Sequence, residues 1–99
     1  MQLTAILATL VAAAAARDFT LYDEVNFGGN RHRETRNDDA ACWNMNGAGD
    51  RASSVAGGRG CTTFYRDRDC RGSNWQQRGN AFTVPDFLDN HIYSFRNRC

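Results

Sequence analysis

The sequence predicts an all-β protein in which two four-stranded units pack face to face as an eight-stranded β-sandwich, stapled by two disulfides. Three observations predict this fold. Past Arg17, no window repeats apolar residues at helical spacing for more than one turn. Short runs rich in Phe, Tyr, Thr, Ile and Val alternate with Gly, Asn and Asp, which is typical of short antiparallel strands. A spaced pattern of an aromatic residue and a glycine occurs twice along the chain.

The first 16 residues have the character of a secretory signal peptide. Residues 3–16, LTAILATLVAAAAA, form a continuous run of apolar and small residues that is too short to span a bilayer. The small residues at its end fit a cleavage site after Ala16, although no basic residue precedes the run. We therefore expect a secreted, extracellular protein whose single domain spans residues 17–99 and has a small core.

Eight strands are expected in this domain, in two sets of four. Their predicted ranges are 18–23, 31–36, 41–45, 52–56, 61–66, 74–78, 81–84 and 91–97. The glycine-rich stretch AGGRG at 56–60 is predicted to link the first half, about 18–56, to the second half, about 61–99. A four-stranded unit of about 40 residues cannot cover its own apolar face, so the two units are expected to pack together.

Each half opens with the same turn. The stretch LYDEVNFGG at 21–29 recurs 43 positions later as FYRDRDCRG at 64–72. Phe19 and Leu21 share one face of the first strand and Tyr22 lies on the other, where its ring can cover Phe27. The glycine two residues after Phe27 suits a positive φ. The turn is therefore expected to fold a hairpin back onto its own sheet.

These residues resemble the Greek-key signature of the βγ-crystallin superfamily, in which two spaced aromatic residues and a glycine are followed further on by a structural serine. The matching residues are Tyr22, Phe27, Gly29 and Ser54 in the first motif and Tyr65, Gly72 and Ser94 in the second. Cys70 stands where the second aromatic residue is usual, so a disulfide could replace ring packing there. The resemblance covers Asp18 to Cys99.

Four cysteines in a short secreted chain, Cys42, Cys61, Cys70 and Cys99, predict two disulfides. The residues alone allow three pairings. The resemblance implies that strands one, two and four of each half form a sheet completed by strand three of the other half. In that topology Cys99 could pair with Cys42 or with Cys61. The charged second strand, RHRETR at 31–36, would then be a sheet edge.

The resemblance also implies two degenerate calcium sites. Many members of the superfamily bind calcium through paired stretches that contain two acid or amide residues, two others, a hydroxyl residue and a serine, and such hard oxygen ligands suit calcium. In GDRASS at 49–54, Gly49 replaces the first acid or amide but Asp50 and Ser53 remain. In DNHIYS at 89–94, Tyr93 replaces the hydroxyl residue, and the matching residues are Asp89 and Asn90.

Two interpretations of these stretches stay open. Calcium could bind with low affinity through the remaining oxygen ligands, and the site that keeps Ser53 is the better candidate. Alternatively, the stretches are ordinary Greek-key loops in which Ser54 and Ser94 fix their hairpins by side-chain to backbone hydrogen bonds. No other cofactor is expected.

No catalytic residue is predicted. A small ribonuclease could use His32, Glu34 and His91 for acid–base chemistry, but we favour a charged edge strand and a loop histidine. Twelve arginines, no lysine and eleven acidic residues give a net charge of +1. Because the signs are interleaved, we expect a solvated mixed-charge surface rather than nucleic-acid binding. Trp43 and Trp75 lie within predicted strands and are expected to pack rather than form a binding platform.

A basic ridge on the second half could touch anionic cell surfaces; its members are Arg59, Arg66, Arg68, Arg71 and Arg78. The sequence thus predicts a secreted, non-enzymatic protein with an extracellular binding, antimicrobial (toxin-like) or inhibitory role. The resemblance implies such roles, because the secreted microbial members of the superfamily are similar to killer toxins, antifungal proteins and metalloproteinase inhibitors. The expected partner is an unidentified extracellular target, either a cell surface or a protease, or there is none, and no membrane span is expected. The alternatives are a calcium-stabilised structural or stress protein and a small ribonuclease.

Overall fold

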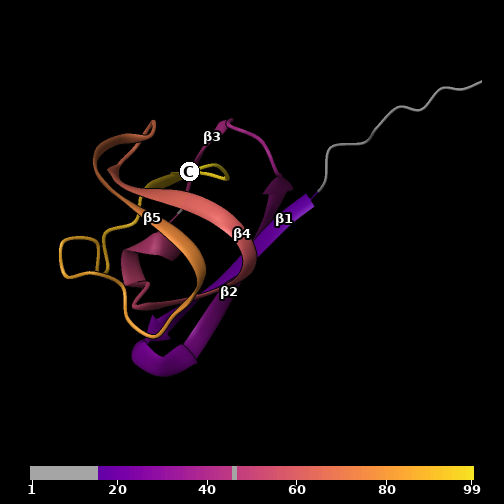
Figure 1. Cartoon of the computed structure of the whole chain (residues 1–99). Helices are drawn as coiled ribbons and strands as arrows, with labels where there is room; N and C mark the ends of the chain where they lie inside the picture. The colour runs from indigo at the N-terminus through magenta and orange to yellow at the C-terminus, as the bar shows by residue number, and fades with distance from the viewer. Residues whose placement is uncertain (1–15, 46) are drawn as a thin grey trace, which may run out of the picture.

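A computed structural model describes residues 16–45 and 47–99 (Figure 1). This part of the chain is all-β, with six strands and two short 3-10 helices: β1 Ala16–Glu24, η1 Val25–Phe27, β2 Gly28–Asn37, β3 Cys42–Asn44, η2 Ala48–Arg51, β4 Ser54–Asp67, β5 Arg71–Ala81 and β6 Ser94–Arg96. The expected signal peptide lies outside the described residues except for Ala16. Among the residues described, no helix has the length and apolar character needed to cross a membrane.

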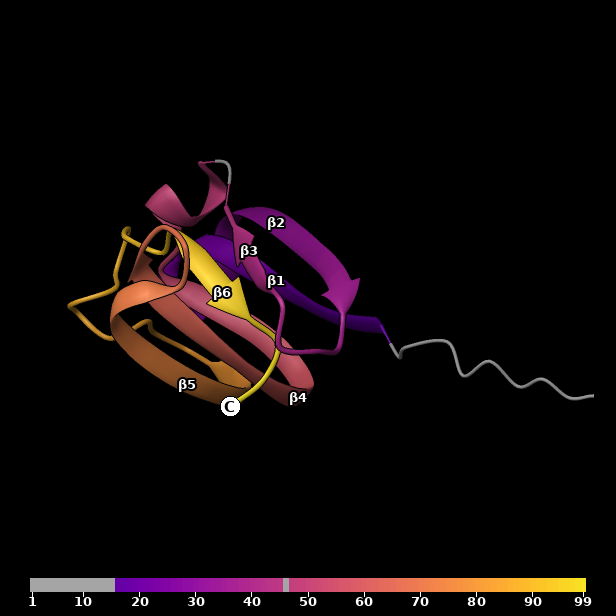
Figure 2. The same ribbon diagram turned by 90° about the horizontal axis from the view of Figure 1, so that it is seen from above.

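The strands form one hydrogen-bonded sheet in the order β2-β1-β4-β6-β3, and β5 also pairs with β4. Every recorded pairing is antiparallel. Figures 1 and 2 show that the long strands β4 and β5 curve strongly, so the sheet curls. The charged strand β2 stands at one edge of this sheet, as its sequence predicts, and β3 stands at the other.

Six strands replace the eight that the sequence predicts for this part of the chain. Residues 54–56 of the range 52–56 and the whole range 61–66 belong to one strand, β4, and the range 81–84 contributes only the last residue of β5. The stretch AGGRG is therefore not a separate loop but part of β4. Ala56 pairs with Asn80 and Cys61 pairs with Arg78, so four residues of β4 face one residue of β5 in a large bulge.

The glycines of the bulge make room for a side chain and a neighbouring strand. A Cβ atom on Gly60 would lie 3.0 Å from Nε of Arg17. A Cβ atom on Gly57 would lie 2.5 Å from the carbonyl oxygen of Gly79. Glycine inside a strand marks either a bulge or a close approach, and here it marks both. The sequence predicted AGGRG as the link between the halves, and the structure shows these residues as a bulged part of one continuous strand.

Strand β4 connects the two halves of the sheet. Its first residues pair with β1, where Val55 stands opposite Leu21. Its later residues pair with β6, where Phe64 stands opposite Phe95. Strand β3, from the first half, pairs with β6, from the second half. This pairing is one of the two exchanges of third strands that the resemblance implies; the expected third strand of the second half, 81–84, is not a separate strand in the structure.

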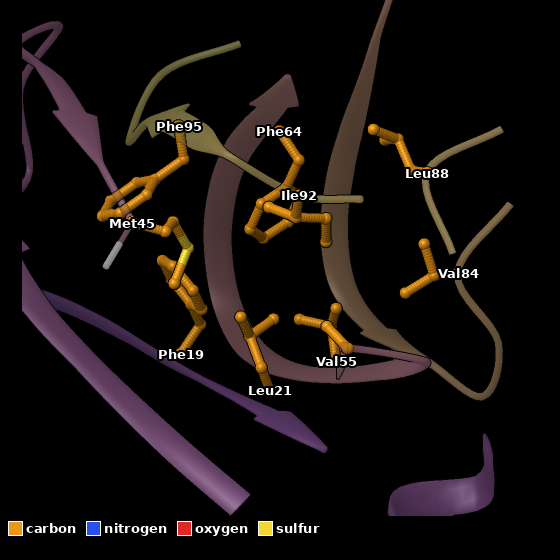
Figure 3. Close-up of a cluster of buried hydrophobic side chains, with 10 residues drawn as sticks. Phe19, Leu21, Met45, Val55, Phe64, Val84, Leu88, Ile92 and Phe95 are labelled. Atoms are coloured by element: carbon orange, nitrogen blue, oxygen red, sulfur yellow. The ribbon is translucent and has the colours of Figure 1, made fainter. Parts of the chain in front are cut away.

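Both halves fill one apolar core, shown in Figure 3. Its buried members are Phe19, Leu21, Met45, Ala52, Val55, Phe64, Val84, Leu88, Ile92 and Phe95. The ring of Phe19 meets the rings of Phe64 and Phe95 edge-on, with centroids 5.2 and 5.0 Å apart. Burial of each large apolar side chain contributes about 1.5–3 kcal/mol. Because Phe19 comes from one half and its partners from the other, the two halves stabilise each other.

Candidate functional site

The same hydrogen bonds build the two repeated turns. In the first turn, the Ser54 hydroxyl donates to the carbonyl oxygen of Glu24 at 2.6 Å and accepts from the N–H of Phe27 at 3.0 Å. In the second turn, the Ser94 hydroxyl donates to the carbonyl oxygen of Asp67 at 2.5 Å and accepts from the N–H of Cys70 at 2.8 Å. Both serines are fully buried. Each serine therefore ties its turn to the strand that closes the same half.

The backbone conformation of the turns is also duplicated. Positive φ values occur at equivalent positions, namely Asn26, Phe27 and Gly29 in the first turn and Asp69, Cys70 and Gly72 in the second. A Cβ atom on Gly72 would lie 2.3 Å from Oδ2 of Asp67, so glycine is also required there for space. The spacing of the sequence repeat thus reflects a repeated backbone shape.

Different side chains close the two turns. Tyr22, one residue of the first turn, packs against Phe27 with ring centroids 5.7 Å apart. The second turn has Cys70 in the place of Phe27, and its sulfur is bonded to Cys42 of β3. The other disulfide joins Cys61 and Cys99, so Cys99 pairs with Cys61 and not with Cys42. All four cysteines are oxidised.

The two calcium-type stretches contact each other. The N–H of Asn90 donates to the carbonyl oxygen of Ala52 at 3.0 Å. The Ser53 hydroxyl donates to Oδ1 of Asp89 at 2.7 Å. A hydroxyl from the first half and a carboxylate from the second half therefore meet. Asp50 is exposed in η2.

The side chains of the two stretches supply only part of a calcium site. Ser53 and Asp89 supply adjacent hard oxygen atoms, which suit calcium. At Gly49 a Cβ atom would lie 1.9 Å from the carbonyl oxygen of Ile92, so an acid cannot replace this glycine without a backbone shift. In residues 16–45 and 47–99 no group of three or more His, Cys, Asp or Glu side chains is placed to hold a metal ion. Backbone carbonyls and water would have to complete the six to eight oxygens that calcium usually takes.

Two of the three residues considered for acid–base chemistry lie together on β2. Nε2 of His32 is 2.5 Å from Oε2 of Glu34, and Nη2 of Arg36 is 3.3 Å from Oε1 of Glu34. Both oxygens of the Glu34 carboxylate are thus engaged by cations or donors of the same strand. His91 lies instead in the segment before β6, where its ring neighbours that of Tyr93. The three residues do not form one cluster.

The two tryptophans differ in exposure. Trp75 packs against the core, with its ring centroid 5.8 Å from that of Phe64. Trp43 is 36% exposed and has the Arg36 guanidinium 4.9 Å from its ring centroid. The packing prediction is therefore right for Trp75 and wrong for Trp43. Trp43 lies on β3, the edge strand of the sheet that the described residues form.

Sequence reasoning does not single out Arg17, which the structure buries to 6% exposure against the bulge of β4. Its Nη1 donates to the carbonyl oxygen of Gly57 at 2.5 Å. A signal for this was present in AGGRG, because glycines within a strand also mark the close approach of another group. Arginine is rarely buried, so its type alone gives no hint of burial.

Comparisons with known proteins agree with this geometry. No family model matches the chain, and no curated protein matches its sequence. A βγ-crystallin from an archaeon is 29% identical, with a TM-score of 0.65, and the match covers 84% of this chain and 99% of that chain. A βγ-crystallin from Ciona intestinalis is 19% identical, with a TM-score of 0.66, over 82% of this chain and 99% of that chain.

A double mutant of a βγ-crystallin domain from Clostridium beijerinckii is 17% identical, with a TM-score of 0.66, over 81% of this chain and 94% of that chain. Nearly the whole length of each of these domains is therefore matched. The matches therefore extend over both halves of this chain. The chain belongs to the βγ-crystallin superfamily.

Proposed function

We propose that this chain is a secreted, non-enzymatic protein that acts by binding an extracellular target, a cell surface or a protease, in an antimicrobial or inhibitory role. The observation that carries the proposal is the use of all four cysteines in two disulfides. Disulfides persist in oxidising compartments and stabilise small domains by about 2–4 kcal/mol each. The apolar run at residues 3–16 supports export.

Expression of the full chain in a secreting host tests the location. We expect protein in the medium whose N-terminal residue is Arg17 and which contains no free thiol. Protein that stays inside the cell with its first 16 residues intact would overturn the proposal. Exposure of microbial cells and a panel of extracellular proteases to the secreted protein then tests the binding role, and binding to none of them would overturn that part.

The contacts of Glu34 support a role without catalysis. Its carboxylate is held by His32 and Arg36, an arrangement that stabilises an edge strand and leaves neither Glu34 oxygen without a partner. Incubation with RNA should give no cleavage above that of a His32→Ala variant. Cleavage that is lost in this variant would show a ribonuclease instead.

The proposed binding protein has two layers, as the eight-stranded sandwich predicted from the sequence requires. The exchange of β3 supports this arrangement, and so does the N–H of Val84, which donates to the carbonyl oxygen of Ser53 at 2.8 Å. Segment 81–84 would then serve as the eighth strand of the sandwich. Slow amide exchange at Val84 would support this, and fast exchange would contradict it.

A second candidate is a calcium-stabilised structural or stress protein, and the contact between Ser53 and Asp89 favours it. Calcium sites of extracellular modules have dissociation constants of about 10⁻⁴–10⁻³ M, so millimolar calcium would stabilise the fold by about 0.5–1.5 kcal/mol. Titration of calcium into chelator-treated protein should raise the Tm by a few degrees.

Asp89→Asn should remove this shift, whereas Asp86→Asn, which removes an exposed carboxylate nearby, should keep it. No change of Tm at millimolar calcium would exclude the second candidate. An equal shift in both variants would show that calcium acts elsewhere.

A further inference from the structure

A cavity of about 440 Å³ lies where the start of β1 meets the bulge of β4. Its lining includes Arg17, Asp18, Gly58, Arg59 and Asn80. None of these residues belongs to the calcium-type stretches or to the repeated turns. The volume falls within the range of about 300–1,000 Å³ that is common for small-ligand sites.

One wall of this cavity is Arg17, whose positive charge is buried. Its Nη1 donates to two neutral carbonyl oxygens, that of Gly57 at 2.5 Å and that of Asp18 at 2.8 Å. Its Nε is buried and has no hydrogen-bond partner among the described residues. A buried guanidinium without a contacting anion costs free energy, because carbonyl dipoles only partly replace its lost hydration.

The nearest carboxylates are already paired with other arginines. Oδ2 of Asp18 accepts from Nη2 of Arg33 at 2.9 Å, and Oδ1 of Asp38 accepts from Nη1 of Arg98. Burial lowers the pKa of the Arg17 guanidinium, and the charges of Asp38 and Asp18 raise it. Arginine nevertheless stays charged in proteins. Within the described part of the chain, Arg17 therefore has no carboxylate of its own.

A second arginine lines the same cavity from the bulge. Arg59 is exposed, and the N–H of the preceding Gly58 donates to Oδ1 of Asn80 at 3.0 Å, which fixes the bulge against β5. Two guanidinium groups thus line one cavity, and one of them lacks an anionic partner. The planar donors of arginine match the oxygens of phosphate and sulfate groups.

We propose that this cavity binds an oxyanion group, a sulfate or a phosphate, carried by an extracellular ligand. The proposal rests on the proposed binding role and deepens it by naming the chemistry of the ligand. The group would neutralise Arg17 and Arg59 together. Cleavage after Ala16, which also lines the cavity, would remove that residue and add the α-ammonium group of Arg17 to the same site. The source of the group is either a sulfated glycan or a free inorganic anion.

Nuclear magnetic resonance titration of the secreted protein tests the proposal, at constant ionic strength set with chloride. The probes are inorganic sulfate, inorganic phosphate and a sulfated disaccharide. We expect saturable shifts of the Arg17 Nε–Hε signal and of the amide signals of residues 57–60. The variant Arg59→Gln should weaken binding about tenfold, whereas Arg68→Gln, which removes the same charge from the turn between β4 and β5, should change it less than about twofold.

Arg17→Gln is not the main test, because loss of the Arg17 side chain is expected to unfold the bulge. Arg59 is exposed, so Arg59→Gln is expected to leave the fold intact. Shifts that never saturate, or an equal loss of affinity in Arg59→Gln and Arg68→Gln, would overturn the proposal. Tighter binding of the sulfated disaccharide than of sulfate would support a glycan ligand, and equal binding would support a free anion. If no anion binds in the titration, the oxyanion site is excluded, but the free-thiol count and the N-terminal residue found in the secretion experiment are unaffected. Failure of the oxyanion site can therefore be told apart from failure of the proposed secretion.

Discussion

The two Greek-key turns share a backbone but differ in the side chain that closes them. In the first turn Phe27 packs against Tyr22, and in the second Cys70 forms a disulfide with Cys42. The serine hydrogen bonds and the positive φ values are the same in both. The difference shows that the backbone and the serine define the turn, whereas the closing side chain can be exchanged for different chemistry.

The closing side chains nevertheless have one property in common, because each contacts the other half. Phe27 packs against Phe82, which follows β5, with ring centroids 5.3 Å apart. Cys70 is bonded to Cys42 on β3. Backbone contacts repeat this pattern: the N–H of Asn26 donates to the carbonyl oxygen of Phe82 at 2.9 Å, and the N–H of Asp69 donates to Oδ1 of Asn44 at 2.7 Å. The closing residues therefore join the two halves.

Removal of the disulfide of the second turn should have the largest effect. Cys42→Ser combined with Cys70→Ser is expected to lower the free energy of unfolding by about 3 kcal/mol, because the unfolded chain is no longer constrained. Urea denaturation measures this loss. A loss below about 1 kcal/mol would mean that the disulfide is not the counterpart of the aromatic pair.

Removal of either serine hydroxyl should have a smaller effect, and the same effect in both turns. Ser54→Ala and Ser94→Ala each leave a partly buried N–H and a partly buried carbonyl oxygen without the serine partner, so each should cost about 2 kcal/mol. Ser73→Ala, at an exposed position of β5, is the control and should cost less than about 0.5 kcal/mol. If either Ser54→Ala or Ser94→Ala left the free energy of unfolding nearly unchanged, the two turns would not be equivalent.

The contact between Phe27 and Phe82 should have the smallest effect. A double-mutant cycle of Phe27→Leu and Phe82→Ala should give a coupling energy of about 0.5–1 kcal/mol, since the rings are in contact but Phe82 is 66% exposed. A cycle of Phe27→Leu with Phe87→Ala, at another exposed phenylalanine, should show no coupling. Equal coupling in both cycles would contradict a specific contact between the halves.

The sequence predicted the features that depend on local pattern. These are the all-β class, the repeated turn with its glycine and the shared face of Phe19 and Leu21. The edge position of β2 was implied by the resemblance. The sequence failed where the meaning of a residue depends on a distant partner. It did not show that AGGRG is a bulged part of one strand, because the glycines give no sign that Arg17 fills the space beside them. The pairing of four cysteines and the exposure of Trp43 likewise depend on which strands become neighbours.

The central claim is that two equivalent turns are closed by different side chains, Phe27 in the first and Cys70 in the second. The most direct test is amide hydrogen exchange at positions 27 and 70, whose N–H groups donate to Ser54 and Ser94. In the oxidised protein both amides should exchange slowly. In Cys42→Ser combined with Cys70→Ser, exchange at position 70 should become at least about tenfold faster, while exchange at Phe27 changes less than about twofold. Equal acceleration at both positions, or no acceleration at position 70, would contradict this expectation.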